Sequence, residues 1–177
     1  VVISRGQLVE IGGGFRVPDV LNESGGKLVE VGTTNRTHLQ DYEKAILEVE
    51  NRAALILRMH HSNFRIIGFT TEPILPELVE LGHEHSLPVV DNLGSGALLE
   101  TTAFGLGHEP TVQESLRYGA DVVCFSGDKL LGGPQCGLIV GKKSLIKRIK
   151  VNPIARTVRS DKWTIALLEE ALRSLRI

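Results

Sequence analysis

Short apolar runs alternate along the chain with longer segments in which apolar residues recur every three or four positions. A short run that is apolar throughout predicts a strand buried on both faces, and the three-to-four spacing predicts a helix with one apolar face. We expect strands near residues 1–4, 27–31, 53–59, 88–91, 121–125 and 136–140. We expect helices near residues 16–23, 39–49, 74–86, 111–118, 142–150 and 161–177.

This alternation predicts an α/β fold with a mostly parallel sheet and helices on both of its faces. The strands expected at 121–125 and 136–140 are joined by only ten residues. A parallel crossover needs about a dozen residues or more, so this pair is expected to be antiparallel. Ligands of open α/β sheets bind at the carboxyl ends of the strands, which directs attention to the residues that follow each run.

The segment 120–141 carries the strongest chemical signal. Its first apolar run ends at Phe125 and is followed by Ser126-Gly127-Asp128-Lys129. We expect the flanking strands to hold Lys129 away from water, because a desolvated amine is less charged and can form a Schiff base with a carbonyl. A surface lysine in a hairpin loop is the plain alternative. The serine, the glycines and both strands favour a lysine that binds pyridoxal phosphate.

Three further residues could hold the same cofactor. Asp91 is expected to end the strand at 88–91, where a carboxylate can pair with a protonated pyridine nitrogen; an Asx-turn is its alternative role. The hydroxyl of Ser126 could bind the cofactor's phosphate, although a turn serine is uninformative by itself. The amide of Asn63 could bind the ring's phenolic oxygen or simply close a turn.

Composition fits one globular domain of 177 residues, of which 42% are hydrophobic. No apolar run approaches the ~18 residues of a membrane span, and no signal peptide is apparent, so we expect a cytoplasmic protein. Cys124 and Cys136 lack the spacing of metal ligands and are expected to remain thiols in a reducing cytosol. The absence of an initiator methionine and an opening inside an expected strand indicate an excised piece of a longer protein.

Charge is unevenly distributed along the chain. Residues 142–177 hold ten Lys and Arg against three Asp and Glu, whereas the net charge of the whole chain is −1. A basic segment suggests an anionic partner such as phosphate or RNA, and a solvated helix face is the alternative. Within it, Arg156 and Arg159 are expected one turn apart at a helix entrance, where two guanidinium groups suit an oxyanion. The alternative is that Arg156 and Arg159 are simply two solvated arginines without a bound anion.

Other motifs are excluded by their spacing. Gly12-Gly13-Gly14 does not match the Gly-x-Gly-x-x-Gly pattern after a strand, and no Walker motif is present. His60 and His61 have no third ligand at matching spacing, and His83 and His85 cannot share a helix face. We therefore expect no metal site.

Five collinear blocks resemble one known family, the bacterial L-seryl-tRNA(Sec) selenium transferases. The most specific are Gly32-Thr33-Thr34-Asn35-Arg36-Thr37 and Ser126-Gly127-Asp128-Lys129-Leu130-Leu131-Gly132-Gly133-Pro134-Gln135. The others are residues 4–19, residues 90–96 and the segment around Arg156 and Arg159. Asp91-Asn92-Leu93 departs slightly from the family's pattern, but Asp91 keeps the carboxylate in place.

The resemblance implies a fold-type-I pyridoxal-phosphate enzyme in which Lys129 binds the cofactor. It also implies that Arg156 and Arg159 hold selenophosphate and that Thr33 and Thr34 lie near the substrate. Asp128 is expected to tune Lys129 or to assist protonation of the leaving group.

The implied reaction converts seryl-tRNA(Sec) to selenocysteinyl-tRNA(Sec) through aminoacrylyl-tRNA. Residues 1–150 would form an N-terminally truncated cofactor-binding domain, and residues 151–177 a basic segment and helix leading towards a small C-terminal domain. The family's main tRNA-binding segment would lie outside this chain. The resemblance also implies that the full protein is a homo-oligomer, a decamer, and that it has no membrane partner. It further implies that this fragment is inactive alone. Two alternatives stay open: another fold-type-I lyase or transferase acting on a small amino acid or amino sugar, and a non-catalytic tRNA-binding or assembly module.

Overall fold

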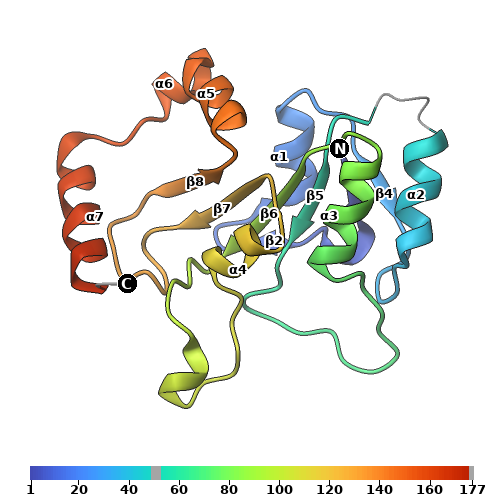
Figure 1. The fold of residues 1–177 in the computed structure, drawn as a ribbon, viewed down its shortest axis with the longest axis horizontal. Helices are drawn as coiled ribbons and strands as arrows, with labels where there is room; N and C mark the ends of the chain where they lie inside the picture. The colour runs from blue at the N-terminus through green and yellow to red at the C-terminus, as the bar shows by residue number, and fades with distance from the viewer. Residues whose placement is uncertain (49–52, 176–177) are drawn as a thin grey trace. The chain divides into compact units, whose positions relative to one another are not determined.

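The computed structural model describes residues 1–48 and 53–175 (Figure 1). The chain divides into two compact units, Val1–Val90 and Asp91–Ile177, and each is described by itself. Strands and helices alternate in both units, as the apolar pattern predicted. The predicted α/β class is confirmed.

The first unit is built on parallel strands in the order β4-β1-β5. Val2 on β1 pairs with Val29 on one side and with Ile56 on the other, and β1 is buried throughout. The elements of this unit are β1 (Val2–Ser4), η1 (Arg5–Gln7), β2 (Glu10–Ile11), β3 (Phe15–Arg16), α1 (Val17–Glu23), β4 (Val29–Val31), α2 (Leu39–Glu48), β5 (Ile56–Met59) and α3 (Leu75–Glu84).

Helices α2 and α3 bury their apolar faces in this unit and contact each other (Figure 1). Tyr42 and Leu78 are both fully buried. A Cβ on Gly82 of α3 would lie 2.5 Å from the Val89 side chain, so the close approach of helix and strand requires glycine there.

The chain enters the second unit through β6 (Val89–Gly94), and the strands of that unit follow the order β6-β7-β8. Its other elements are η2 (Thr101–Phe104), α4 (Val112–Arg117), β7 (Val122–Ser126), β8 (Gly137–Gly141), α5 (Lys143–Val151), α6 (Pro153–Thr157) and α7 (Lys162–Leu175). β7 and β8 are antiparallel, paired from Val122 with Gly141 to Ser126 with Gly137. The short connection therefore predicted their direction correctly.

All the predicted strands and helices are present, with ends shifted by a few residues. The predicted helix ends at residue 49 and at residues 176–177 lie outside the described residues. Four short elements were not predicted: η1, η2, α6 and the β2–β3 hairpin, whose turn contains Gly12-Gly13-Gly14. Among the described residues, no helix is both long and apolar enough to cross a membrane.

Candidate active site

Lys129 lies in a tightly closed turn between β7 and β8. The N–H of Gly127 donates to the Cys136 carbonyl at 2.8 Å, and the N–H of Gly133 donates to the Gly127 carbonyl at 2.7 Å. A Cβ on Gly127 would lie 2.6 Å from Cys136 Sγ, so the turn needs glycine there. The backbone on either side of Lys129 is therefore well fixed.

The Lys129 side chain is exposed, as are those of Asp128 and Leu130. The expectation that the flanking strands hold Lys129 away from water is therefore wrong for this chain. The physical reason is that β8 stands at the edge of the β6-β7-β8 order and is itself poorly covered, with Ile139 46% exposed. The case for Lys129 rests on its turn and on the sequence resemblance.

Asp91 is fully buried on β6, the neighbour of β7. Ser115 on α4, also buried, donates a hydrogen bond from Oγ to Asp91 Oδ2 at 2.7 Å. β6 continues to Gly94, so Asp91 lies within the strand and not at its end as predicted. The Asx-type turn is made instead by Asn92, whose Oδ1 accepts the Gly94 N–H at 3.1 Å. A buried carboxylate favours a cationic partner, because Coulomb attraction is strong where water is excluded.

The charge of Asp91 also acts on Cys124 of β7. Burial, assisted by that negative charge, raises the pKa of the Cys124 thiol to about 11. Cys124 is therefore protonated and unreactive at neutral pH. Cys136 is likewise a free cysteine, as predicted.

The loop after β6 lies against the turn that carries Lys129. The N–H of Leu130 donates to the Ser95 carbonyl at 3.0 Å. A Cβ on Gly96, whose φ is +69°, would collide with the carbonyl oxygen of Ser126. The second unit thus brings together the strand of the buried carboxylate, the predicted phosphate-binding serine and the lysine turn.

Ser95 is a candidate that the sequence pattern did not single out. It is buried, and its Oγ has no hydrogen-bond partner within the described part of the chain. An unpaired buried hydroxyl costs about 1–3 kcal/mol, which favours a bound polar group beside it. Pyridoxal phosphate presents an aldehyde, a basic ring nitrogen and an anionic phosphate. An amine, a buried carboxylate and a buried hydroxyl on adjoining segments fit those three groups.

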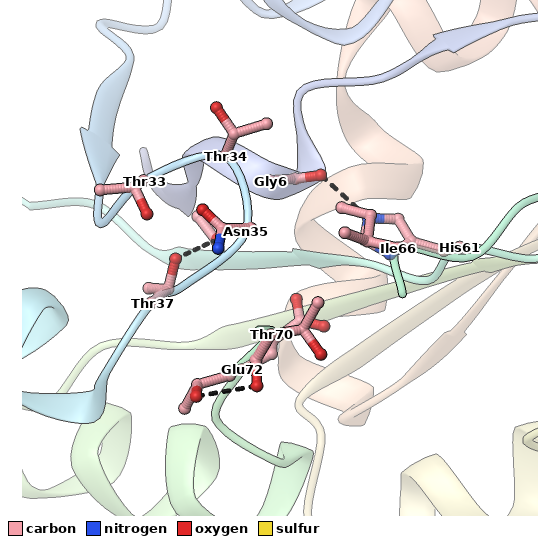
Figure 2. A pocket seen from close by; sticks show the side chains of 11 residues that line it. Gly6, Thr33, Thr34, Asn35, Thr37, His61, Ile66, Thr70 and Glu72 are labelled. Carbon is pink, nitrogen blue, oxygen red and sulfur yellow. Dashed lines mark hydrogen bonds between the residues drawn. The ribbon is translucent and has the colours of Figure 1, made fainter. Parts of the chain in front are cut away.

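The first unit holds a polar pocket of about 190 Å³ where β1 and β4 end (Figure 2). Thr33 and Thr34, predicted to lie near the substrate, both line it, and Thr33 Oγ1 donates to the Arg36 carbonyl at 2.9 Å. His61 and Glu72 are the titratable groups of its wall. Hydroxyl groups otherwise dominate the lining, so the pocket suits a polar ligand.

Asn63 lies four residues beyond β5, in an exposed loop of the first unit. It is not one of the residues that line the pocket, although His61, two residues earlier, is. Thr33 and Thr34 therefore line the same cavity. Asn63 is close to the lining residue His61 in the sequence but does not line the cavity itself.

Arg156 lies in the last turn of α6, and Arg159 lies in the segment between α6 and α7. The prediction that both sit at a helix entrance is wrong for Arg156, because Pro153 begins a separate short helix. At the start of α7, Asp161 Oδ1 already accepts two backbone N–H groups, at 2.7 and 3.0 Å. Both arginines are exposed and accessible to an anion.

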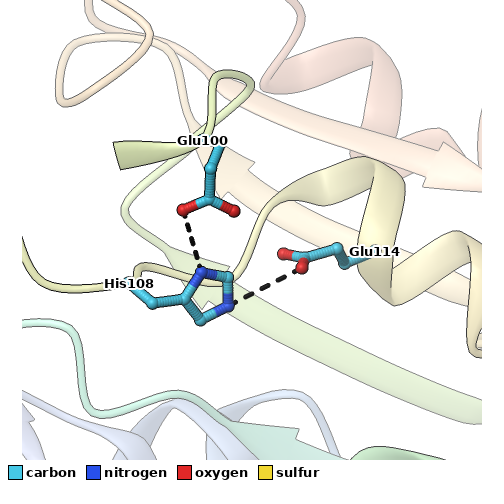
Figure 3. Close-up of side chains that lie close together, drawn as sticks. All are labelled: Glu100, His108 and Glu114. Carbon is cyan, nitrogen blue, oxygen red and sulfur yellow. Dashed lines mark hydrogen bonds and ion pairs between the residues drawn. The ribbon is translucent and has the colours of Figure 1, made fainter. Parts of the chain in front are cut away.

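The sequence pattern did not predict a cluster in the second unit, in which Glu100 and His108 are exposed and Glu114 is half-buried (Figure 3). His108 lies with Nδ1 3.1 Å from Glu100 and with Nε2 3.6 Å from Glu114. The hydrogen bond between His108 and Glu100 is the main cause that raises the pKa of the imidazole and lowers the pKa of the Glu100 carboxyl. The three ligand atoms lie within 4.8 Å of one another, but both imidazole nitrogens already face carboxylates. We describe this cluster as an ion-pair network.

The chain is similar to one known protein family over nearly its whole length. The family described as L-seryl-tRNA selenium transferase matches residues 1–176. An L-seryl-tRNA(Sec) selenium transferase of Alkaliphilus metalliredigens is 57% identical over 98% of the chain, and one of Desulfotalea psychrophila is 58% identical over 98%. The chain spans only 36% and 37% of the length of these two relatives.

Solved structures share the fold at lower sequence identity. D-glucosaminate-6-phosphate ammonia-lyase superposes with a TM-score of 0.76 at 23% identity, over 99% of this chain and 42% of that one. A structure described as SPT with PLP internal aldimine superposes with a TM-score of 0.66 at 15% identity, over 98% of this chain and 40% of that one. The fold is that of the large domain of fold-type-I pyridoxal-phosphate enzymes.

Proposed function

The chain belongs to the L-seryl-tRNA selenium transferase family, and we propose that it forms the catalytic core of an enzyme that converts seryl-tRNA(Sec) to selenocysteinyl-tRNA(Sec). The proposed cofactor is pyridoxal 5′-phosphate, and the proposed selenium donor is selenophosphate. The observation that carries the proposal is the buried carboxylate of Asp91, bonded to Ser115 of α4, on the strand next to the one that leads into the Lys129 turn. The fold that the chain shares with structures solved with this cofactor supports it further.

When bound, pyridoxal phosphate would supply an electron sink for negative charge at the substrate Cα. Lys129 Nζ would hold the cofactor at its aldehyde carbon, and the same amine would be the base for the proton on the substrate Cα. Asp91 would accept a hydrogen bond from the protonated ring nitrogen. The complete burial of this carboxylate strengthens the pairing, because few water dipoles screen it.

Hydroxyl and amide groups would hold the rest of the cofactor. Ser126 Oγ would donate a hydrogen bond to its phosphate, and so would Ser95 Oγ, which has no partner among the residues that the structure describes. Such bonds to an anion are stronger than bonds between neutral groups. In the first unit, the Asn63 amide would donate to the oxygen of the ring hydroxyl.

The substrate and the selenium donor would contact residues other than those that hold the cofactor. Arg156 and Arg159 would bind the oxyanion of selenophosphate, because the planar guanidinium fork matches phosphate geometry. Thr33 and Thr34 would contact the substrate through their pocket. Asp128 would protonate the departing hydroxyl group of the seryl moiety or tune Lys129.

We further propose that the enzyme acts in the cytoplasm as a homo-oligomer, a decamer by family resemblance. The main tRNA-binding segment is proposed to lie outside this chain, which spans just over a third of its relatives' length. The division into a cofactor-binding domain, residues 1–150, and a connecting basic segment, residues 151–177, stays a prediction.

Borohydride reduction of the full-length protein with pyridoxal phosphate, followed by peptide mapping, tests the assignment. We expect the reduced label on Lys129 and its loss in Lys129→Ala. Lys143→Ala is the matched control, because Lys143 is exposed on α5 of the same unit. Lys142 is less suitable, since it pairs with the buried carboxylate of Asp121. Label on another lysine would overturn the assignment.

Substrate choice separates this function from the alternatives. A lyase or transferase for small substrates would turn over free serine or an amino-sugar phosphate, whereas we expect turnover of seryl-tRNA(Sec) only. A non-catalytic tRNA-binding or assembly module would bind the tRNA without forming a lysine-linked cofactor. Turnover of free serine at the rate of seryl-tRNA(Sec) would contradict the proposal.

A further inference from the structure

The loop that carries Asn63 is fastened to the short helix η1 at two points. Gln7, the last residue of η1, is fully buried although its side chain is polar. Its Oε1 accepts the N–H of Met59, the last residue of β5, at 2.9 Å. Its Nε2 donates to the carboxylate of Glu72. Because both ends of the amide are bonded, the orientation of Gln7 is fixed.

The second point of attachment is two residues further along. His61 Nε2 donates to the carbonyl of Gly6 at 3.0 Å (Figure 2). The His61 ring packs against Phe64, with the ring centroids 4.6 Å apart. The two rings are tilted by 37° to each other, and this aromatic pair flanks the two residues between them, Ser62 and Asn63.

Gly6 itself cannot be replaced without moving η1. A Cβ on Gly6 would lie 2.7 Å from the carbonyl oxygen of Thr34. This close approach fixes η1 against the segment that follows β4, so the carbonyl that His61 contacts is held firmly. The attachment points of the Asn63 loop thus belong to a well-packed part of the first unit.

Asn63 has no comparable support of its own. Within the described residues, no hydrogen bond holds its side chain, and it is exposed. Its position is therefore set by the backbone between Met59 and Phe64. We propose that Gln7 and His61 are positioning residues that place the Asn63 amide for its hydrogen bond to the cofactor's ring hydroxyl. This inference rests on the proposed function.

The expected consequence is spectroscopic. A donor to the ring oxygen stabilises its deprotonated form, so losing that donor shifts the pH midpoint of the lysine-linked cofactor's absorbance upward. One hydrogen bond corresponds to roughly one pH unit or less. Gln7→Met keeps the side chain's length and burial but removes both hydrogen bonds, so we expect it to raise the midpoint.

The experiment is a double-mutant cycle on the full-length protein loaded with pyridoxal phosphate. Asn63→Ala measures the full effect of losing the amide. If Gln7 acts through Asn63, the midpoint of the double variant equals that of Asn63→Ala alone. Should Gln7→Met fold poorly, His61→Phe replaces it, because it keeps the ring against Phe64 and removes only the bond to Gly6.

Thr101→Val is the matched control. Thr101 is buried in the second unit and makes two hydrogen bonds to backbone groups, at 2.7 and 3.0 Å. We expect this variant to lose stability without shifting the absorbance midpoint. A wild-type midpoint in Gln7→Met and His61→Phe, or additive shifts in the double variant, would overturn the inference alone. Wild-type protein without any lysine-linked absorbance would overturn the proposed function and the inference with it.

Discussion

Removing the hydroxyl group beside Asp91 separates the structural role of Asp91 from its proposed chemical role. Ser115→Ala removes the hydroxyl that lies 2.7 Å from Asp91 Oδ2. Both side chains are buried, at 0% and 2% exposure, so water cannot replace the lost bond easily. A hydrogen bond to a charged group contributes about 1.5–3 kcal/mol, and we expect the free energy of unfolding to fall by that amount.

The matched control is Ser174→Ala on α7. Ser174 is exposed and donates to the Glu170 carbonyl at 3.0 Å, so water can replace it. We expect that variant to stay within about 0.5 kcal/mol of wild type. The measurement is urea unfolding of the full-length protein, monitored by circular dichroism. The urea midpoints of the two variants are compared under one common slope of unfolding free energy against urea concentration.

Asp91→Asn should show the opposite balance. An asparagine oxygen can still accept from Ser115, so most of the stability is retained. The ring nitrogen loses its anionic partner, and exchange of the substrate Cα proton should fall by roughly 10²- to 10⁴-fold. Ser115→Ala keeps the carboxylate and should change exchange far less. If Ser115→Ala is as stable as Ser174→Ala, or if Asp91→Asn exchanges at the wild-type rate, this reasoning is refuted.

Three further variants test other parts of the chain. Replacing Arg156 and Arg159 with alanine should raise the selenophosphate concentration needed by about ten- to a hundred-fold for each, measured as donor dependence of the full-length enzyme, while tRNA binding stays unchanged. His108→Gln should lower the thermal unfolding midpoint most between pH 4.5 and 6.5. The raised pKa of the His108 imidazole gives stability that is lost as the pH rises above 6.5. The lowered pKa of the Glu100 carboxyl gives stability that is lost as the pH falls below 4.5. Gly96→Ala should destabilise the protein in the same assay, because its Cβ meets a backbone carbonyl at a φ of +69°.

The strands and helices were predictable because their signals are local. The run from Val122 to Phe125 is apolar throughout, and the short connection after it leaves room only for an antiparallel return. The β2–β3 hairpin was missed because strands of two residues carry too little pattern. Its glycines do not match a nucleotide-binding pattern; Gly13 and Gly14 instead adopt φ values of +83° and +80°, which make the turn.

The partners of the candidate site residues were much less predictable. Ser115 lies on a helix, 24 residues from the carboxylate it contacts, and nothing in its local sequence indicates that contact. Ser95 lies in the block 90–96, but nothing in its local sequence indicates that its buried hydroxyl finds no partner among the described residues. Thr33 and Thr34 were selected by family resemblance and do line a pocket, but the companions that the fold gives them, His61 and Glu72, come from other segments.

Asp91 and Lys129 show why burial is harder to infer than backbone form. Asp91 lies on an inner strand and is covered by α4, so the chain itself excludes water from the carboxylate. Lys129 follows an equally apolar strand, but its hairpin partner is an edge strand, and the side chain stays exposed. An apolar run predicts a strand, but it does not report what covers that strand or the turn beyond it, as the poorly covered β8 shows. These two strands leave Lys129 exposed, and under the proposed function the bound cofactor would cover it.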